Sequence, residues 1–473
     1  MEIRPTTDED LDVFVDTVHA AFGRFPETPV EGGGLWWSAL ETDRCLLALT
    51  ADGRPVGTAA THSFELTLPG ETAVPAPGVT AVGVLPSHRR QGVLTAMMRY
   101  QLAELRARGE LLSVLLASEA SIYGRFGYGP ATYTAQLKVQ RHEAAFAAPR
   151  ARALADAPAT GSDDGSGDGL GDGSGDGLGD GQDGGSFNGL GDGQDGGSFN
   201  GPVDGQDGGS FNGPVDGPVD GSGNGPGSGS VEVLRRAECG GILEEVYDRY
   251  RRTQPGALSR PHRWWALRAG QPPISREPRY IAVHRDAAGA PDGYASYSIE
   301  SGTLTVDETI ATDDAVFTAL ARFVLAHDLV SQVVFKHLPP EHPLRRQLAD
   351  FRAGQVSGDM DWLWVRLLDV PRALTARGWF MDGELVLDVH DPFLGERDRY
   401  LLTVRNGKAD CAPTDRKPDL SLDIRDLGSV YLGGTAPSTL VRAGHIRAHH
   451  PDAATLADTL FRAERSPHCL HWF

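Results

Sequence analysis

Hydrophobic residues in the N-terminal part of the chain follow two different spacings, which predict a mixed α/β unit. Residues 8–22 carry apolar side chains at the spacing of an amphipathic helix, whereas later segments alternate like strands. Glycine-containing turns, Asp52-Gly53 and Pro69-Gly70, separate the first strands. The predicted elements are, in order, a helix over 8–22, strands over 44–50, 55–68 and 73–84, a helix over 89–108, and strands over 111–116 and 132–139.

Residues 159–230 interrupt this pattern because they contain few hydrophobic side chains and repeat themselves. The sequence GQDGGSFNG begins at Gly181, Gly193 and Gly205, a period of twelve residues. A calcium-binding β-roll is one interpretation of repeats rich in Asp and Gly, but such rolls use nonapeptide repeats and stack apolar residues. So little apolar surface does not offset the entropy lost on ordering the segment. We therefore predict a flexible linker here.

The residues after the linker predict two further folded units. Residues 231–370 repeat the order of helices and strands of the first unit, but no strand leads into a basic turn with glycine. From about Trp379 the pattern changes to a small sheet with helices, and the chain ends on Trp472-Phe473. The expected strands are 231–234, 280–284, 293–300, 303–306, 329–335, 384–389, 400–404 and 419–424, and the expected helices are 240–252, 313–327, 427–432, 438–443 and 452–463. The fold class is therefore α/β with α+β, in the domains 1–158, 159–230 (the linker), 231–370 and 371–473.

Length and charge narrow the class of protein. A chain of 473 residues is expected to form more than one domain. The net charge of −20 says little about partners, because thirteen aspartates and no Lys, Arg or Glu lie in residues 161–230. The remainder is mildly acidic, which argues against nucleic acid as a partner. No apolar run is long enough to predict a membrane span, and the N-terminus lacks the pattern of a signal peptide.

Cysteine usage indicates the compartment. Cys45, Cys239, Cys411 and Cys469 are scattered, form no CxxC pair and show no metal-ligand spacing. Because this pattern fits neither a disulfide framework nor a zinc site, we expect a reduced cytoplasm and no metal cofactor.

A basic turn at residues 89–94, Arg-Arg-Gln-Gly-Val-Leu, is the strongest candidate for a binding site. It follows the strand that ends Val82-Gly83-Val84 and precedes a long helix. The first N–H groups of a helix have no intrahelical partners and lie at its positive end, so a pyrophosphate binds there. The alternative is an Arg-rich helix start that tolerates a glycine. The surrounding strand and helix favour the first interpretation, with the strand offering backbone groups to the amide-rich arm of a coenzyme.

A second candidate segment follows the next apolar strand. Ser118 can cap a short helix that carries Tyr123, and Tyr128 lies in the same glycine-rich stretch. Either ring fills the core at this turn or donates a proton to a leaving thiolate. Spacing alone leaves both tyrosines open.

Acidic and histidine residues give weaker signals. Glu119, Glu27 and Glu65 are possible bases for an amine nucleophile, although ordinary surface carboxylates have the same pattern. His445, His449 and His450 form a tempting metal cluster, but no acid completes the set, so we interpret them as structural or solvent-facing. Trp36 and Trp37 are candidates for an aromatic wall or for the core.

The order of strand, basic turn, helix, strand and tyrosine resembles the GNAT acetyltransferase superfamily. More narrowly, SEASIYGRFGYGPAT, with HRRQGVL before it, resembles the enhanced-intracellular-survival (Eis) acetyltransferases of actinobacteria. The resemblance continues in VYDRYRRTQPGALSRP, WLWVRLLDVPRALTARGW and LGSVYLGGTAPSTL, so it covers nearly everything except 159–230. It implies an active GNAT domain, a second GNAT-like domain without catalysis, and a sterol-carrier-like domain.

The resemblance also implies a reaction and its residues. The protein would transfer acetyl from acetyl-CoA, its cosubstrate, to a primary amine of an aminoglycoside-like, polyamine-like or lysine-type acceptor. The family's general acid falls on Tyr123, and its base on the α-carboxylate of Phe473, whose basicity burial would raise above the usual pKa of about 3.5. The coenzyme contacts fall on Val82, Gly83, Val84, Arg90, Gln91, Gly92, Val93, Leu94, Thr95, Ser118 and Glu119.

Departures from the family concern the acceptor. The resemblance implies acids near Arg24 and at the position of Trp472, so their loss weakens the case for a polycationic aminoglycoside. Protein-lysine acetylation is a rival activity, and a lipid-binding or scaffolding protein with a vestigial GNAT site is a rival of another class. The family also implies a homo-oligomer, a hexamer.

Overall fold

A computed structural model describes residues 1–23, 37, 39–147, 229–268 and 279–473 of the chain. The described residues belong to one compact unit. The predicted linker therefore lies outside the described residues apart from its last two positions, and Ser230 already begins the strand β8 (Ser230–Leu234). The linker remains a prediction.

The first sheet has seven strands within the described residues, in the order β1-β2-β3-β4-β5-β14-β6. Its strands are β1 (Glu2–Pro5), β2 (Cys45–Leu49), β3 (Pro55–Thr67), β4 (Ala73–Val84), β5 (Leu112–Leu116), β6 (Gly129–Pro130) and β14 (Leu363–Leu367). Helices α1 (Leu11–Ala21) and α3 (Val93–Ala107) cover opposite faces. Along β2, Leu47 packs with Phe14 of α1, and the next residue, Ala48, packs with Met97 of α3. This is the alternation expected for a strand buried on both faces.

The second sheet repeats this architecture. Its order within the described chain is β13-β7-β12-β11-β10-β9-β8. The remaining strands are β7 (Tyr133–Gln140), β9 (Tyr280–Arg285), β10 (Pro291–Glu300), β11 (Thr303–Ala311), β12 (Gln332–Leu338) and β13 (Gly354–Asp361), and the helices are α6 (Arg236–Cys239), α7 (Ile242–Thr253), α8 (His262–Arg268), α9 (Asp314–Leu325) and α10 (Leu344–Gln347). The parallel pair β11–β12 corresponds to β4–β5 of the first sheet.

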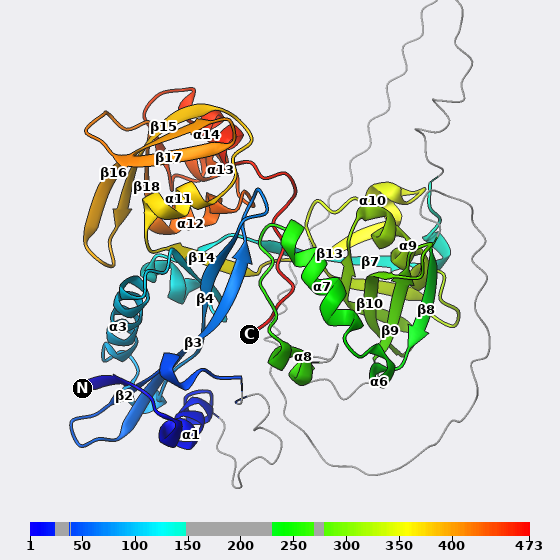
Figure 1. Cartoon of the computed structure of the whole chain (residues 1–473), viewed down its shortest axis with the longest axis horizontal. Helices are drawn as coiled ribbons and strands as arrows, with labels where there is room; N and C mark the ends of the chain where they lie inside the picture. Colours follow the sequence, from blue (N-terminus) through cyan, green and yellow to red (C-terminus); the bar gives the residue numbers. More distant parts are fainter. Residues whose placement is uncertain (24–36, 38, 148–228, 269–278) are drawn as a thin grey trace, which may run out of the picture. The chain divides into compact units, whose positions relative to one another are not determined.

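The two sheets exchange strands. The alternating residues 132–139 were expected to end the N-terminal unit, but β7 lies in the second sheet, where Leu137 pairs with Phe335 and Val356. In return, β14 inserts between β5 and β6, with Val365 opposite Val114 and Gly129. Figure 1 shows β7, in cyan, among the green and yellow strands. The prediction that residues 132–139 complete the first sheet is therefore wrong. Alternation of apolar and polar residues indicates which face of a strand is buried, but it does not indicate which strand it pairs with.

The third domain is the expected small α+β unit. Its sheet has the order β17-β16-β15-β18-β19 among the described residues. The elements are β15 (Gly383–Asp391), β16 (Glu396–Arg405), β17 (Lys408–Pro413), β18 (Leu420–Asp423), β19 (Arg447–Ala448), α11 (Val370–Ala376), α12 (Ile424–Tyr431), α13 (Pro437–Arg442) and α14 (Ala453–Phe461). Helix α12 packs closely on β14, since a Cβ at Gly428 would lie 2.2 Å from the carbonyl oxygen of Val365.

The last residues return to the first two domains. The side chain of Gln254 donates to the carbonyl of Ser466 at 2.9 Å, and the amide of His468 donates to the carbonyl of Pro255 at 2.8 Å. Leu470 is buried in the cluster around α7. Most of the chain's C-terminal segment, residues 467–473, is therefore buried, as its apolar ending predicts.

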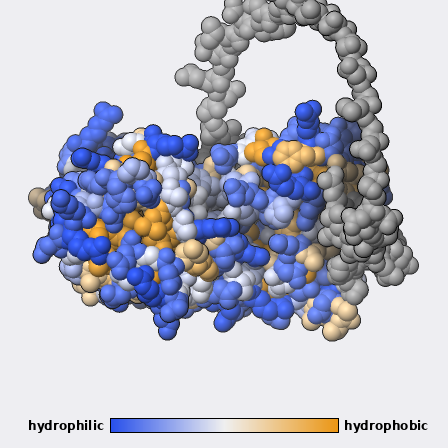
Figure 2. All heavy atoms as spheres, turned by 90° about the horizontal axis from the view of Figure 1, so that it is seen from above, coloured by the Kyte–Doolittle hydropathy of each residue, from blue (hydrophilic) through white to orange (hydrophobic). Residues whose placement is uncertain are grey.

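Hydrophilic residues, in blue, make up most of the face in Figure 2, with orange residues in smaller areas between them. No helix within the described ranges is long and apolar enough to cross a membrane.

Candidate active site

Strands β4 and β5 separate soon after they meet. Their parallel ladder consists of the pairs Gly78–Val114 and Val79–Leu115, whereas β4 continues to Val84 alongside β3. A bulge follows the ladder, with Ala81 at φ 48°. In the described chain, the backbone of residues 80–84 therefore has a free edge toward β5, and the predicted contacts Val82, Gly83 and Val84 lie on it. An extended, amide-containing ligand can pair with such an edge.

The basic turn beside this edge is a loop, not the first turn of the helix. Helix α3 begins at Val93, later than the predicted Arg89, because Arg90 (φ 62°) and Gly92 (φ 83°) adopt left-handed conformations that end any right-handed helix. Gly92 caps α3 with no side-chain hydrogen bond, and a Cβ at this position would have no atom within 4 Å. The space before the free amides of Val93 to Thr95 is therefore open.

The two arginines of the turn have different surroundings. Arg89 donates to the carbonyl of Ala21 at 2.7 Å, which ties the turn to the end of α1. Arg90 is exposed and forms no hydrogen bond or ion pair with any described residue. Gln91 reaches back to the carbonyl of Ser87 at 3.1 Å. Arg90 is thus the charge available to an anion at the start of α3.

Tyr123 lies between the free edge of β4 and the start of α3. It ends the short helix α4 (Ala120–Tyr123) and packs in a cluster with Val79 and Met98, against which Val82 and Leu94 also pack. Burial, and next the negative charge of Glu119, raise the pKa of Tyr123 to about 12. The phenol is therefore protonated at neutral pH, the state that a proton donor requires.

Ser118 does not cap this helix, contrary to the prediction. The N-cap is Glu119, in an extended conformation and without a side-chain hydrogen bond to the helix. Ser118 instead forms a hydrogen bond with Tyr123 that opposes the rise in its pKa. Both residues remain next to the phenol, since Glu119 is close enough to act on its pKa.

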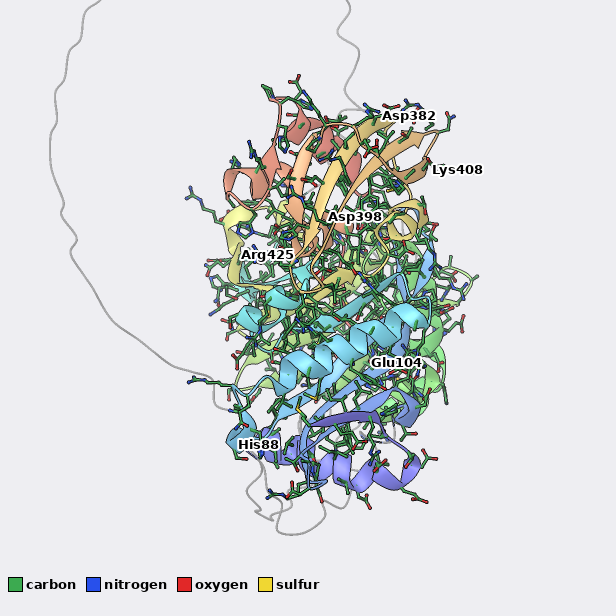
Figure 3. All side chains as sticks on the ribbon, turned by 90° about the vertical axis from the view of Figure 1, so that its left-hand side faces the viewer. His88, Glu104, Asp382, Asp398, Lys408 and Arg425 are labelled. Carbon is green, nitrogen blue, oxygen red and sulfur yellow. The ribbon has the colours of Figure 1, made fainter. Side chains whose placement is uncertain are left out.

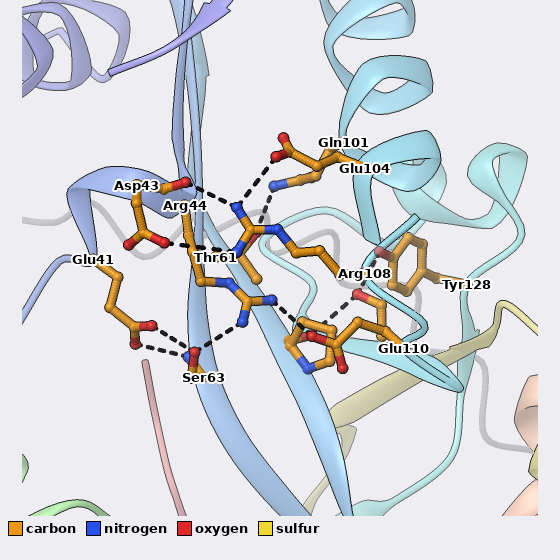
Figure 4. Close-up of polar contacts among 12 residues, drawn as sticks. Glu41, Asp43, Arg44, Thr61, Ser63, Gln101, Glu104, Arg108, Glu110 and Tyr128 are labelled. Carbon is orange, nitrogen blue, oxygen red and sulfur yellow. Dashed lines mark hydrogen bonds and ion pairs between the residues drawn. The ribbon is translucent and has the colours of Figure 1, made fainter. Parts of the chain in front are cut away.

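Tyr128 has a different role. Its hydroxyl lies 2.9 Å from the hydroxyl of Ser113, which donates to the carbonyl of Pro77 at 3.1 Å, and Tyr128 is fully buried. Figure 4 shows this contact beside the buried pair of Gln101 and Thr61. The hydroxyl of Tyr128 therefore belongs to the core, and the role of Tyr123 as the proton donor stays a prediction.

Phe473 lies on the other face of the sheet at the same place. A Cβ at Gly78 would come within 2.8 Å of the Phe473 ring, which is 6% exposed. The neighbouring Val79 contributes its side chain to the Tyr123 cluster. Successive strand residues point to opposite faces. Tyr123 and Phe473 therefore flank, from opposite sides, the point where β4 and β5 part.

Aromatic and histidine rings surround the terminal residue. Phe64 lies 5.0 Å from the Phe473 ring, and His471 lies 5.9 Å from it. His62 pairs across the strands with Gly78, and its ring lies 4.9 Å from that of Trp264. Burial lowers the pKa of His62 to about 4, so the imidazole is neutral at pH 7. Sequence analysis did not single out His62 or Trp264, because one histidine in a strand and one tryptophan in a helix are common in cores.

The weaker candidates are dispersed. Glu65 is half exposed and pairs with Arg251 at 3.2 Å, whereas Glu27, Arg24 and Trp36 lie outside the described residues. Trp37 contacts the ring of His19 edge-on at 5.4 Å, a packing contact. The histidines of the third domain take separate partners: His445 faces Asp426, His449 faces Ser421, and His450 faces Asp419. No group of three or more His, Cys, Asp or Glu side chains in the described chain is arranged to hold a metal.

The second domain differs at the corresponding helix start. Helix α9 is capped by Asp313, whose carboxylate accepts hydrogen bonds from the amides of Ala315 and Val316 at 2.9 and 2.8 Å. A side-chain anion already occupies the amides that are free at α3. This explains physically why the sequence lacks a second basic turn.

Comparisons with known proteins agree with this architecture. The family model "Acetyltransferase (GNAT) domain" matches residues 2–131, a second acetyltransferase (GNAT) domain model matches 256–367, and "Sterol carrier protein domain" matches 370–470. An uncharacterized N-acetyltransferase from Streptomyces avermitilis is 32% identical over 485 residues, 100% of this chain and 99% of that protein. N-acetyltransferase Eis from Mycobacterium tuberculosis is 30% identical over 448 residues, 92% of this chain and 90% of that protein.

Solved structures show the same fold. The crystal structure of Eis1 from Mycobacterium abscessus matches with a TM-score of 0.75 and 28% identity, and the match covers 100% of both chains. A GCN5-related N-acetyltransferase from Anabaena variabilis matches over 100% of both chains with a TM-score of 0.72 at 18% identity, which shows a shared fold. The predicted tandem GNAT folds and sterol-carrier-like domain are thereby confirmed.

Proposed function

Because the chain belongs to the Eis-type N-acetyltransferases of the GNAT family, we propose that it transfers acetyl from acetyl-CoA to a primary amine where β4 and β5 part. The observation that carries this proposal is the open start of α3 beside the free edge of β4. An anion and an amide-rich arm each have a matching surface there, in the order in which acetyl-CoA presents them.

Different residues of the chain would bind different parts of acetyl-CoA. Arg90 supplies charge to the pyrophosphate, and the free amides of Val93 to Thr95 donate hydrogen bonds to it. Gly92 leaves the space in which the anion approaches the backbone. Val82 to Val84 pair with the pantetheine arm, and this places the thioester near Tyr123.

Acetyl transfer needs a base on the amine and an acid on the departing sulfur. The α-carboxylate of Phe473 accepts a proton from the amine, directly or through water, so that the neutral nitrogen attacks the thioester carbonyl. Tyr123 donates its phenolic proton to the thiolate as the carbon–sulfur bond breaks. The positions of the two residues on opposite faces of the opening support these roles, because donor and acceptor then enter from different sides.

The acceptor is a primary amine of a polyamine-like, aminoglycoside-like or lysine-type molecule. Trp472 at the penultimate position removes one carboxylate from the expected acceptor cleft, which favours acceptors with fewer positive charges. Turnover of acetyl-CoA across aminoglycosides, polyamines and lysine peptides decides among the three classes, and rapid acetylation of lysine peptides alone would identify a protein acetyltransferase. The four cysteines, scattered along the sequence without a CxxC pair, support a cytoplasmic location.

Tyr123→Phe tests the mechanism. We expect a kcat lowered by about 100-fold, the size of a general-acid contribution, with the affinity for acetyl-CoA in calorimetry unchanged. Tyr128→Phe is the matched control, because it removes a hydroxyl of the same turn that bonds to Ser113 and should retain turnover. Unchanged kcat in Tyr123→Phe removes the phenol from the mechanism, and absence of acetyl-CoA binding to the wild type refutes the proposed function.

A further inference from the structure

The loop between β15 and β16 in the third domain, together with the first residue of β16, contacts helix α3 and the turn that follows Tyr123, two parts of the proposed acetyl-CoA site. Glu396 forms a two-pronged ion pair with Arg106 of α3, at 2.8 and 2.9 Å. The ring of Phe393 packs edge-on against that of Phe126, 5.0 Å away, and Phe126 lies three residues after Tyr123. The guanidinium of Arg99, on α3, lies 5.4 Å from the Phe393 ring. Figure 3 shows α3, with Glu104 labelled, beside the sheet that carries Asp398.

The same hairpin provides a buried ion pair. Asp391 accepts a hydrogen bond from Arg366 of β14, and the two side chains are 7% and 0% exposed. Arg366 also donates to the carbonyl of Phe126. The guanidinium lies directly against Gly127 (φ 82°), because a Cβ there would come within 1.6 Å of its Nη1. One arginine therefore joins the third domain to the turn that follows Tyr123.

The hydrogen bonds of that turn show what the arginine does. The carbonyl of Tyr123 accepts from the amide of Tyr128 at 3.3 Å, and the carbonyl of Gly124 accepts from the amide of Gly127 at 3.0 Å. The Phe126 carbonyl points to Arg366 instead. Burying a charge is costly unless it is paired, so the guanidinium keeps this position only while Asp391 neutralises it.

We propose that Arg366 and Asp391 are positioning residues for acetyl transfer: Asp391 holds Arg366, and Arg366 fixes the turn that sets the height of the Tyr123 phenol beside the thioester. The sterol-carrier-like domain then has a part in catalysis without contacting substrate. This inference rests on the proposed role of Tyr123 as the proton donor. Misplacing a reacting group by a fraction of an ångström lowers kcat while ground-state binding is retained.

Asp391→Asn tests the proposal, since it keeps the shape of the side chain and removes its charge. We expect kcat to fall about tenfold or more and the KM for acetyl-CoA to stay within about twofold. Asp388→Asn is the matched control: Asp388 lies on the same strand and pairs with Arg397, away from the Tyr123 turn, and this variant should keep the wild-type kcat.

A double-mutant cycle separates positioning from general damage. If Asp391 acts through the phenol, Asp391→Asn changes kcat less than about twofold once Tyr123→Phe is present. An equal loss in both backgrounds, or a folded Asp391→Asn enzyme with wild-type kcat, overturns the proposal. If Tyr123→Phe alone leaves kcat unchanged, the role of Tyr123 itself is refuted.

A second variant covers the case in which Asp391→Asn does not fold. Arg366→Met combined with Asp391→Leu removes both buried charges together, a replacement that folded proteins commonly tolerate. We expect this enzyme to bind acetyl-CoA in calorimetry and to show the same loss of kcat, again absent in the Tyr123→Phe background. Wild-type turnover by this paired variant also overturns the inference.

Discussion

The terminal residue provides a test that separates charge from packing. Appending two residues, Gly-Ser, after Phe473 converts its α-carboxylate into a neutral amide and leaves the ring in place. Phe473→Ala does the reverse, because it keeps a terminal carboxylate and removes the ring that contacts Phe64 and Gly78. Trp472→Ala is the matched control for kcat at saturating amine, since this side chain is 37% exposed and the last residue, with its carboxylate, is unchanged.

The structure sets the loss of kcat that we expect for each variant. The loss of a general base costs about 100-fold or more in kcat, so the extended chain should show at least that loss. Burial of a phenylalanine ring contributes about 2 kcal/mol, which corresponds to about a 30-fold change in the fraction of docked chain ends. Because Leu470 and the hydrogen bond of Ser466 still hold the segment, we expect a smaller loss for Phe473→Ala, about tenfold.

The assay is steady-state turnover of acetyl-CoA with a saturating amine, followed by release of free thiol. Calorimetry with acetyl-CoA and thermal unfolding show whether each variant is intact. The expected order of kcat is Trp472→Ala, then Phe473→Ala, then the extended chain. An extended enzyme with wild-type kcat would falsify the terminal base, and a Phe473→Ala enzyme less active than the extended one would show that the ring matters more than the charge.

Three further predictions concern the coenzyme turn, pH and the linker. Gly92→Ala should raise the KM for acetyl-CoA about fivefold above that of Gly92→Asn, because asparagine tolerates φ 83° and alanine is strained there by about 1 kcal/mol; equal KM values would show that this conformation does not matter. Burial lowers the pKa of His62 and His342 to about 4 and that of His468 to about 3, so between these values and about 6.5 the unfolded chain binds protons that the folded chain does not. The free energy of unfolding in urea should therefore fall by about 2 kcal/mol per histidine from pH 7 to pH 5, and a flat profile contradicts it. Deleting residues 161–227, which spares β8, should leave kcat and the melting temperature nearly unchanged, and a large loss of either would show that the repeats are structural.

Local pattern predicted most helices and strands, because each buries one face of its own. The strand predicted at residues 73–84 has the same bounds as β4. The helix predicted at 313–327 differs from α9 (Asp314–Leu325) only at its two ends. The predicted start of α3 was too early, because hydrophobic spacing does not indicate the left-handed conformation of Arg90. The resemblance to known acetyltransferases, rather than spacing, favoured Tyr123 over Tyr128, and the contact of Tyr128 with Ser113 is compatible with that choice.

Long-range partners could not be predicted. Arg366 interrupts the apolar run Leu363–Leu367, and a charge in such a run suggests an exposed strand position; its burial depends on Asp391, which belongs to another domain. The same holds for Phe473, whose place against Gly78 is set by contacts of the preceding residues with Pro255 and Gln254. A charged residue inside an otherwise apolar strand was the one available signal for the Arg366 site.

The exchange of β7 and β14 has a consequence for biosynthesis. Until residue 367 has been synthesised, β5 cannot pair with β14. One edge of β5 then has unpaired backbone N–H and C=O groups, which can pair with another chain. A fragment that ends at residue 131, where the first family match ends, lacks β14, so this edge of β5 would stay unpaired. Attempts to express the catalytic half by itself should therefore yield aggregates, whereas a polypeptide that reaches Leu367 can close both sheets.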